Sequence, residues 1–286
     1  NYDAEIYAFG KRLGEDFSSA TLTTAFTHRS YIEKEEKRRA DLGIDTSAAP
    51  LGLTDNSELL QKGQATASRY IKAYLRYLYP ALYEEGICAI HDHLMSEDTL
   101  AFVARRIGIS DLMLCGDFPP QASTLRDNLL SVVGALQTDQ NVTRAEALVR
   151  DLVLAQLVGV DLSELWSVVN PMGLLMATLH AQGRGPPEPR LLWTAGKRTV
   201  MSVYHVGIYS DRRLIGQSAG ETSTIAEEMA AMDALKCLTG ITDSRSPLPF
   251  RADADKVQLD YDHINTRAED VLQQFEQSQK SQTYQT

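Results

Sequence analysis

The sequence predicts an α+β protein with two domains and a tail. Residues 1–165 are expected to form an all-helical domain, residues 166–240 a smaller α-β-β-β-α domain, and residues 241–286 a polar C-terminal tail. Apolar residues recur at helical spacing up to about residue 165, without strand-like alternation. After Trp166, three short apolar runs with turn residues between them predict strands, and an alanine-rich helical pattern follows.

The first domain contains five segments with helical periodicity. Gly14 suits a C-cap for the first segment, Pro80 stops the second, and Gly159 follows the last. The expected helices are Asp3–Gly14, Ala65–Tyr79, Asp98–Ile107, Ser123–Leu136 and Arg144–Val158. A run of mixed charges at residues 33–39 is typical of a solvated helix face.

The second domain begins with a short helix and ends with a longer one. A glycine- and proline-rich loop at residues 183–187 follows the first helix, and residues 210–212 form a turn between the last two strands. The expected elements are a helix at Pro171–Gln182, strands at Arg190–Trp193, Val200–Tyr209 and Leu214–Ser218, and a helix at Thr222–Leu238. The glutamine-rich tail is expected to be disordered apart from one helix at Asn265–Phe275.

The charge distribution limits how this chain can bind nucleic acid. Its formal net charge of −10 departs from the basic character typical of nucleic-acid-binding domains. Residues 1–169 hold 16 Lys and Arg against 24 Asp and Glu, residues 170–240 hold 7 against 6, and residues 241–286 hold 5 against 8. Any RNA binding must therefore depend on local basic patches or on a shared assembly. No apolar run reaches the length of a membrane span, and the three cysteines show no disulfide or metal-ligand spacing.

Two segments of the helical domain share a motif pattern. Residues 56–67 read NSELLQKGQATA, and residues 125–139 read LRDNLLSVVGALQTD. A Phe26–Tyr31 segment (FTHRSY) precedes them, and Thr99–Leu114 lies between them. Together these segments resemble the ribonuclease III family, whose signature helices read N-E-R-L-E-F-L-G-D and A-D-x-x-E-A-x-x-G-A. The resemblance implies a helical fold in which four carboxylates hold two magnesium ions that cleave double-stranded RNA.

The carboxylates of that signature are largely absent from this chain. The resemblance places them at Leu60, Gln64, Asp127 and Leu130, so only one acid remains. Positions four or three apart share a helical face, and magnesium requires oxygen ligands that are usually carboxylates. One aspartate cannot hold two divalent ions. We therefore expect the family's fold without catalytic residues, metal or cofactor.

Three features allow a structural as well as a functional interpretation. Asp127 is either a surviving metal ligand or, more simply, an acid in the first turn of a helix that complements the helix dipole. His91-Asp92-His93 suggests a metal site, but a solvated turn is the simpler interpretation. Tyr70, Tyr74 and Tyr77 have the spacing of core or interface residues before that of a base-stacking surface.

The second domain resembles a double-stranded-RNA-binding domain that has lost its lysine pair. In that family a G-x-S-K-K-x-A pattern begins the last helix, and its lysines bind phosphates. The matching run here is Gly220–Ala226, with Ser223 and Thr224 in place of the lysines, so binding to generic duplex RNA should be weak. A domain kept for packing against a partner is an equal alternative. The candidate RNA-binding residues are Lys197, Arg198, Arg212, Arg213, Arg105 and Arg106.

Across the chain, the runs at residues 3–10, 170–175 and 220–228 resemble a family of mitochondrial large-subunit ribosomal proteins that combines these two domains. The resemblance implies a structural constituent of the mitochondrial ribosome in the matrix. Its partners would be mitochondrial large-subunit ribosomal RNA, neighbouring ribosomal proteins and a second ribonuclease III-like protein. Because the chain begins with Asn1, a removed targeting peptide is expected. The alternatives are an active mitochondrial endoribonuclease on duplex RNA and a free RNA-processing or ribosome-assembly factor.

Overall fold

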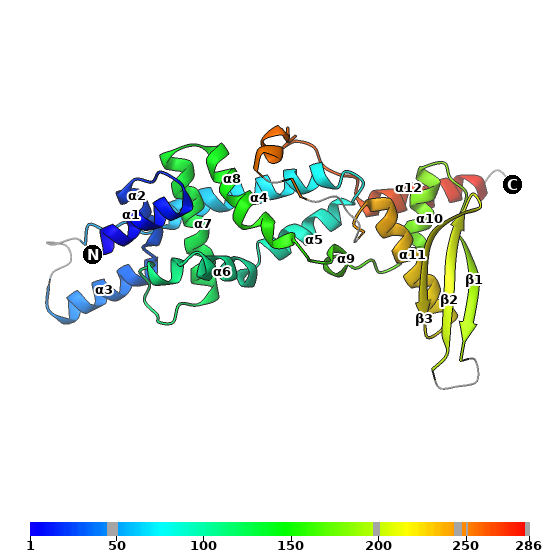
Figure 1. Cartoon of the computed structure of the whole chain (residues 1–286), viewed down its shortest axis with the longest axis horizontal. Coiled ribbons are helices and arrows are strands. Elements are labelled where there is room, and N and C mark those ends of the chain that lie inside the picture. Colours follow the sequence, from blue (N-terminus) through cyan, green and yellow to red (C-terminus); the bar gives the residue numbers. More distant parts are fainter. Residues whose placement is uncertain (45–50, 197–200, 243–247, 250, 284–286) are drawn as a thin grey trace. The chain divides into compact units, whose positions relative to one another are not determined.

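The computed structural model describes residues 1–44, 51–196, 201–242, 248–249 and 251–283 (Figure 1). The chain forms two compact units, and each is assembled from separate stretches of sequence. The first unit, called the helical unit, comprises residues 1–74, 91–160 and 249–261. The second, called the sheet unit, comprises residues 75–90, 161–248 and 262–286. The expected α+β class is confirmed, because helices precede a three-stranded sheet.

The helical unit is built from short helices with recognisable ends. Gly14 closes the first helix with a φ of 73°, and the side chains of Ser96 and Asn141 cap the starts of two others. Two helices, α4 and α5, contribute to both units. The elements are α1 (Tyr2–Leu13), α2 (Ser19–Phe26), α3 (Arg29–Asp41), α4 (Ser57–Leu78), α5 (Glu84–Leu94), α6 (Glu97–Arg106), η1 (Ile109–Asp111), α7 (Ala122–Asp139), α8 (Val142–Leu152), η2 (Leu154–Leu157) and η3 (Arg251–Lys256).

Helix α7 is the centre of the helical unit. Every residue from Asn128 to Leu136 is buried, and α2, α6 and α8 all pack against this helix. Helix α4 crosses α7 at backbone distance, with Gly63 facing Gly134. A Cβ atom on Gly63 would overlap the carbonyl oxygen of Leu130, and one on Gly134 would overlap that of Leu59. Only residues without a side chain permit this approach.

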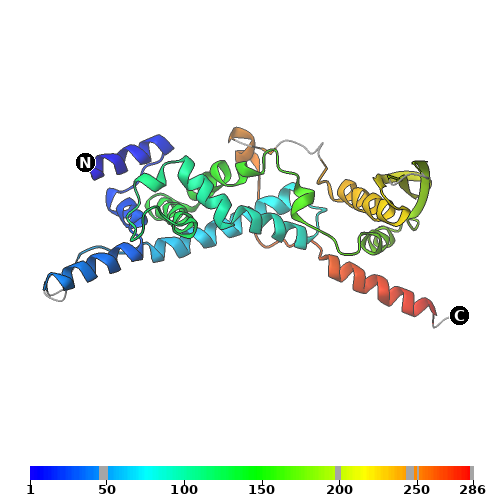
Figure 2. The same ribbon diagram turned by 90° about the horizontal axis from the view of Figure 1, so that it is seen from below.

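The sheet unit consists of an antiparallel sheet in the order β1-β2-β3 with helices packed against it. Figures 1 and 2 show α11 lying along the sheet, and its closest packing is with β3 and β2. The alanine-rich face of α11 allows the helix to lie close to the sheet, and Gly216 and Gly220 of β3 contact its backbone. The elements are α9 (Leu162–Leu165), α10 (Pro171–Ala181), β1 (Glu188–Ala195), β2 (Val203–Ser210), β3 (Arg213–Gly220), α11 (Ser223–Thr239) and α12 (Ala268–Thr283).

The expected tail helix at Asn265–Phe275 corresponds to α12, and the expectation of disorder is wrong for residues 251–256 and 276–283. Residues 251–256 form η3 and residues 268–283 form α12. Within the sheet unit, buried Asn265 donates through Nδ2 to the carbonyl oxygens of Tyr79 (2.9 Å) and Leu82 (2.7 Å). The Glu85 carboxylate accepts from the backbone N–H of Ala268 at the start of α12 (3.0 Å). These bonds and the burial of Val271 order a segment whose composition predicted disorder.

Other boundaries also differ from the sequence-based expectations. Helix α4 begins at Ser57 rather than Ala65, and α2 and α5 were not expected. The predicted solvated helix is α3, whose residues are all at least partly exposed. In the part of the chain that the structure describes, no helix is long and apolar enough to cross a membrane.

The glycine crossing predicts a specific sensitivity of the fold. Gly63→Ala and Gly134→Ala should each lower the free energy of unfolding by about 3 kcal/mol or more, because the added methyl group meets backbone that cannot rotate away. The matched control is Gln61→Ala, at an exposed position on the same helix. Chemical denaturation monitored by circular dichroism measures all three. Equal stabilities for Gly63→Ala and Gln61→Ala would show that the helices are not held at backbone contact.

Candidate functional site

The four positions that correspond to the family's carboxylates lie around the α4–α7 crossing. Leu60 and Gln64 flank Gly63 on α4, and the carbonyl oxygen of Leu130 is the atom that Gly63 faces. Asp127 lies one turn before Leu130 on α7. The structure thus brings the two signature helices together, as the resemblance implies.

The side chains at these positions cannot form a two-metal centre. Leu130 is buried at 2% exposure, Leu60 is half-buried, and Gln64 is exposed. Leucine offers no oxygen, and an amide carries no charge to balance a divalent cation. Two magnesium ions therefore do not fit the residues present. Among the residues that the structure describes, no group of three or more His, Cys, Asp or Glu side chains has a metal-binding arrangement.

Asp127 is neutralised by its own neighbour. The Arg126 guanidinium donates from Nε (2.9 Å) and Nη2 (2.7 Å) to Asp127 Oδ1, and from Nη1 to Glu97 Oε1 (3.1 Å). The Asp127 side chain is 18% exposed, so the pair is partly shielded from solvent. The helix-dipole interpretation is wrong, because α7 begins at Ala122 and Asp127 lies in its second turn. The guanidinium supplies the counter-charge at this position.

Asn56, the first residue of the signature, forms hydrogen bonds at the start of α4. Its side chain is buried, and Nδ2 donates to the Ala25 carbonyl oxygen (3.3 Å). Its backbone N–H donates to the Thr27 carbonyl oxygen (3.0 Å), and its own carbonyl oxygen accepts from the Leu60 N–H (2.8 Å). The Ser131 hydroxyl of α7 reaches the same carbonyl at 3.5 Å. Asn56 thus fixes where α4 begins, a structural role that sequence reasoning missed.

The histidine pair does not lie in a solvated turn, as the sequence suggested. His91 and His93 belong to α5, and His91 is buried. The His91 ring contacts the Ser68 hydroxyl through Nε2 and Asp92 Oδ1 through Nδ1, both at 2.8 Å. Burial lowers the pKa of His91, against the opposing effect of Asp92. His91 is therefore a packed, hydrogen-bonded residue of the helical unit.

The candidate tyrosines separate into two environments. Tyr70 and Tyr74 are buried in the helical unit and pack against each other with ring centroids 5.7 Å apart. Tyr77, farther along α4, is 50% exposed. The first two are core residues, as their spacing suggested, and the third is a surface residue.

The candidate arginines of the helical unit form a cluster with a residue that sequence reasoning missed. Arg105 and Arg106 are exposed at the end of α6, and Arg106 lies over the Phe102 ring at 5.0 Å. Arg12 of α1 donates through Nη2 to the carbonyl oxygen of Ile107 (3.0 Å). Arg12, near the end of α1, is thus held beside the end of α6, which carries Arg105 and Arg106. In the sequence, only the two adjacent arginines at the end of a predicted helix indicated a basic cluster.

In the sheet unit, two candidates lie at the tip of a hairpin. Arg212 has a φ of 65° in the turn between β2 and β3, and Arg213 begins β3; both are exposed. Lys197 and Arg198 lie outside the described residues. At the start of α11, Thr222 caps the helix by accepting from the Ile225 N–H (3.2 Å), and the Ser223 hydroxyl donates to Glu227 (3.0 Å).

Two family models match this chain. A family model described as large ribosomal subunit protein mL44, endonuclease domain, matches residues 1–136. A second model, described as the MRPL44 dsRNA-binding domain, matches residues 166–272. The second match extends past the sheet and α11 into the start of α12.

Individual relatives include both a ribosomal protein and bacterial ribonucleases. Large ribosomal subunit protein mL44 of Caenorhabditis elegans is 32% identical over 247 residues, which cover 86% of this chain and 61% of that protein. Ribonuclease 3 of Symbiobacterium thermophilum is 31% identical over 230 residues, covering 78% of this chain and 90% of the enzyme. The solved nuclease domain of ribonuclease III from Campylobacter jejuni has a TM-score of 0.43 and 18% identity, covering 54% and 96% of the two chains.

The site predicts insensitivity to divalent metal. Millimolar magnesium or manganese should leave the Tm unchanged, because a ligand stabilises a protein only if it binds the folded state. Asp127→Asn should change the free energy of unfolding by about 1 kcal/mol or less, since it removes a partly exposed ion pair. Duplex RNA incubated with either form should stay intact. A metal-dependent rise in Tm, or cleavage that Asp127→Asn abolishes, would restore a working metal centre.

Proposed function

The chain belongs to the mL44 family of ribonuclease III-like proteins, and from this premise we propose that it is a structural constituent of the mitochondrial large ribosomal subunit. In this role it binds ribosomal RNA and neighbouring ribosomal proteins in the mitochondrial matrix and does not cleave the RNA. The proposal is supported chiefly by the loss of the family's metal-binding carboxylates at the α4–α7 crossing. Three of the four acid positions hold Leu60, Gln64 and Leu130, and Arg126 neutralises the fourth.

The arginine cluster at the ends of α1 and α6 is the proposed RNA contact of the helical unit. Arg12, Arg105 and Arg106 are exposed, and none forms an ion pair with an acidic side chain in the described ranges. Arg12 and Arg106 are held by a carbonyl oxygen and an aromatic ring, so less conformational freedom is lost when they bind. Phosphate oxygens are the usual partners of such groups. A local patch of this kind is compatible with an acidic chain.

In the sheet unit, the proposed RNA contacts are Arg212 and Arg213 at the hairpin tip, together with Lys197 and Arg198, which lie outside the described residues. The lysine positions at the start of α11 hold Ser223 and Thr224, which carry no charge. The Ser223 hydroxyl donates to Glu227 instead. Sequence-independent affinity depends on the number of phosphates neutralised, so this unit alone should bind duplex RNA weakly. Its position on the RNA would then be fixed by the rest of the assembly.

A second ribonuclease III-like protein is a proposed partner of the helical unit. The support is the family resemblance alone, since ribonuclease III domains act as pairs. The two competing functions are an active mitochondrial endoribonuclease on duplex RNA and a free factor in RNA processing or ribosome assembly. The first requires the carboxylates that are missing at positions 60, 64 and 130. The second differs from a structural role only in whether the protein remains on mature subunits.

The structural role is tested by replacing the endogenous protein with variants. Val132→Asp places a charge in the core of α7, and the protein and mature large subunits should be lost together. Asp127→Ala should leave subunit abundance nearly normal. Exchange of Arg12, Arg105 and Arg106 for glutamate should keep the fold and release the protein from subunits in a high-salt gradient. Normal subunits with unprocessed RNA precursors in the Asp127→Ala strain would instead favour a nuclease.

The weak-binding proposal is tested by restoring the lysine pair. The full chain carrying Ser223→Lys and Thr224→Lys should bind duplex RNA more tightly than the unchanged chain and with a steeper salt dependence. The slope of log affinity against log salt should increase by about 0.9 for each new phosphate contact. Filter binding at several salt concentrations gives both quantities. An unchanged slope would show that the start of α11 does not face RNA.

A further inference from the structure

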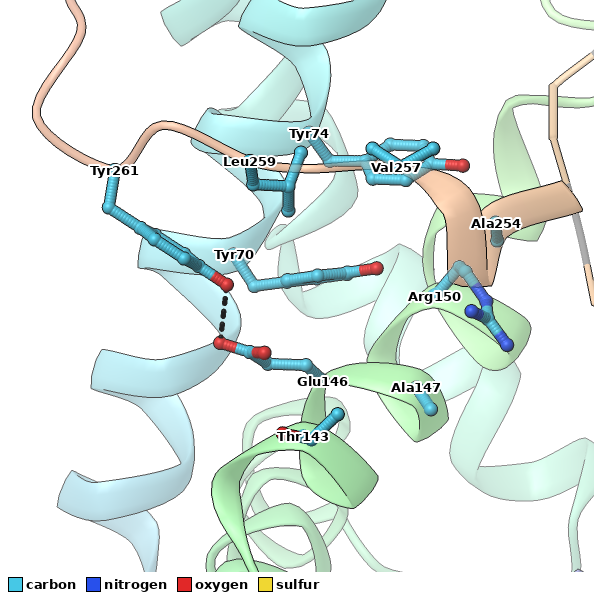
Figure 3. A pocket seen from close by; sticks show the side chains of 10 residues that line it. All are labelled: Tyr70, Tyr74, Thr143, Glu146, Ala147, Arg150, Ala254, Val257, Leu259 and Tyr261. Carbon is cyan, nitrogen blue, oxygen red and sulfur yellow. Dashed lines mark hydrogen bonds between the residues drawn. The ribbon is translucent and has the colours of Figure 1, made fainter.

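A pocket in the helical unit lies away from the emptied metal positions. Its volume is about 400 Å³, and it opens between α4, α8 and the segment that contains η3 (Figure 3). The lining combines aromatic, aliphatic and charged side chains. It consists of Tyr70, Tyr74, Thr143, Glu146, Ala147, Arg150, Ala254, Val257, Leu259 and Tyr261. Size and composition of this kind are typical of small-molecule sites.

The wall formed by residues 249–261 is fastened at both ends. The Tyr74 hydroxyl donates to the carbonyl oxygen of Pro249 (2.6 Å). At the other end, the Tyr261 hydroxyl donates to Glu146 Oε1 (2.7 Å), a bond drawn in Figure 3, and the Arg69 guanidinium lies over the Tyr261 ring at 4.5 Å. The pocket is therefore preformed, so a ligand would not have to order this segment.

Two polar groups that line the pocket, the Glu146 carboxylate and the Tyr70 hydroxyl, can form further hydrogen bonds. The Glu146 side chain is 13% exposed, and Oε1 faces both Tyr261 and Arg69. Its second oxygen, Oε2, has no hydrogen-bond partner among the described residues. The hydroxyl of Tyr70, a residue only 6% exposed, also has none within the described ranges. Burial raises the pKa of Tyr70 well above its usual range, so this hydroxyl is a neutral donor.

Arg150 adds a positive charge to the same pocket. It follows Glu146 by one turn of α8, so both side chains share a helical face. Its side chain is only 9% exposed, and it is paired with Asp151, because Nε donates to Oδ1 (2.8 Å) and Nη2 to Oδ2 (3.4 Å). In Figure 3, Glu146 and Arg150 lie on either side of the Tyr70 side chain. The pocket thus offers a carboxylate acceptor, Glu146, and a hydroxyl donor, Tyr70, beside an aromatic wall.

We propose that this pocket binds a guanine nucleotide. Guanine presents two adjacent N–H donors, N1 and the exocyclic amine, which a carboxylate such as Glu146 can accept together. Tyrosine rings stack on bases, and Tyr261 is the partly exposed tyrosine of the lining. The ligand is either a free mononucleotide or a guanosine of single-stranded RNA turned out of its stack, since both present the same atoms.

The test is calorimetric titration of the full chain with guanosine monophosphate, uridine monophosphate and inorganic phosphate. Guanosine monophosphate should bind saturably and about tenfold or more tightly than uridine monophosphate, the discrimination expected of a bidentate contact. Glu146→Gln should weaken its binding about tenfold or more, and Tyr70→Phe about fivefold, because each removes one polar contact and keeps the side-chain shape. The matched controls, Glu58→Gln and Tyr77→Phe, should bind as the unchanged chain does.

Two short single-stranded oligoribonucleotides identify the source of the ligand. One is uridine-only and the other carries a single central guanosine. Tighter binding of the guanosine oligonucleotide than of guanosine monophosphate assigns the pocket to RNA, and the reverse assigns it to a free nucleotide. The proposal is overturned if no guanine ligand binds, if the two mononucleotides bind equally, or if affinity survives both pocket substitutions in variants whose Tm is unchanged.

Discussion

Backbone contact between α4 and α7 at Gly63 and Gly134 is the constraint on which the helical unit depends. At that distance each helix presents carbonyl oxygens, rather than side chains, to the other. The buried residues of α7 then pack against α2, α6 and α8 around the crossing. Asn56 and Ser131 add hydrogen bonds that fix the start of α4 beside α7. None of these interactions requires an acidic side chain.

Because this packing needs no carboxylate, the family's fold can be kept after the metal-binding residues are lost. Four clustered carboxylates without metal would repel one another and would have to be partly protonated or solvated. Leu130 removes one such charge and contributes apolar burial instead. Arg126 compensates the remaining acid with a covalently tethered cation, which needs no exchangeable ion. Asp127 therefore has a protein counter-charge in place of a metal ion.

The elements that could be predicted from the sequence are those whose apolar residues recur at helical or strand spacing. The strands and the helices α1, α6, α7, α10 and α11 follow from apolar spacing and end within a few residues of their predicted limits. The disordered tail was mispredicted because its order comes from long-range bonds such as those of Asn265, which composition does not encode. The bond from Arg12 to Ile107 was missed for the same reason, whereas the Arg126 partner of Asp127 is its sequence neighbour. Gly63 and Gly134 were a usable signal, since glycine inside a helix is costly unless something requires it.

The order of segments along the chain has a consequence for synthesis. The helical unit contains residues 249–261, which come after nearly all of the sheet unit, and the sheet unit in turn contains residues 75–90. Domains made of one continuous segment can fold in turn as they leave the translating ribosome. Here the helical unit cannot be completed until residues 249–261 have been made, and Tyr70 and Tyr74 stay uncovered until then. Premature termination before residue 249 leaves an aromatic surface without its cover.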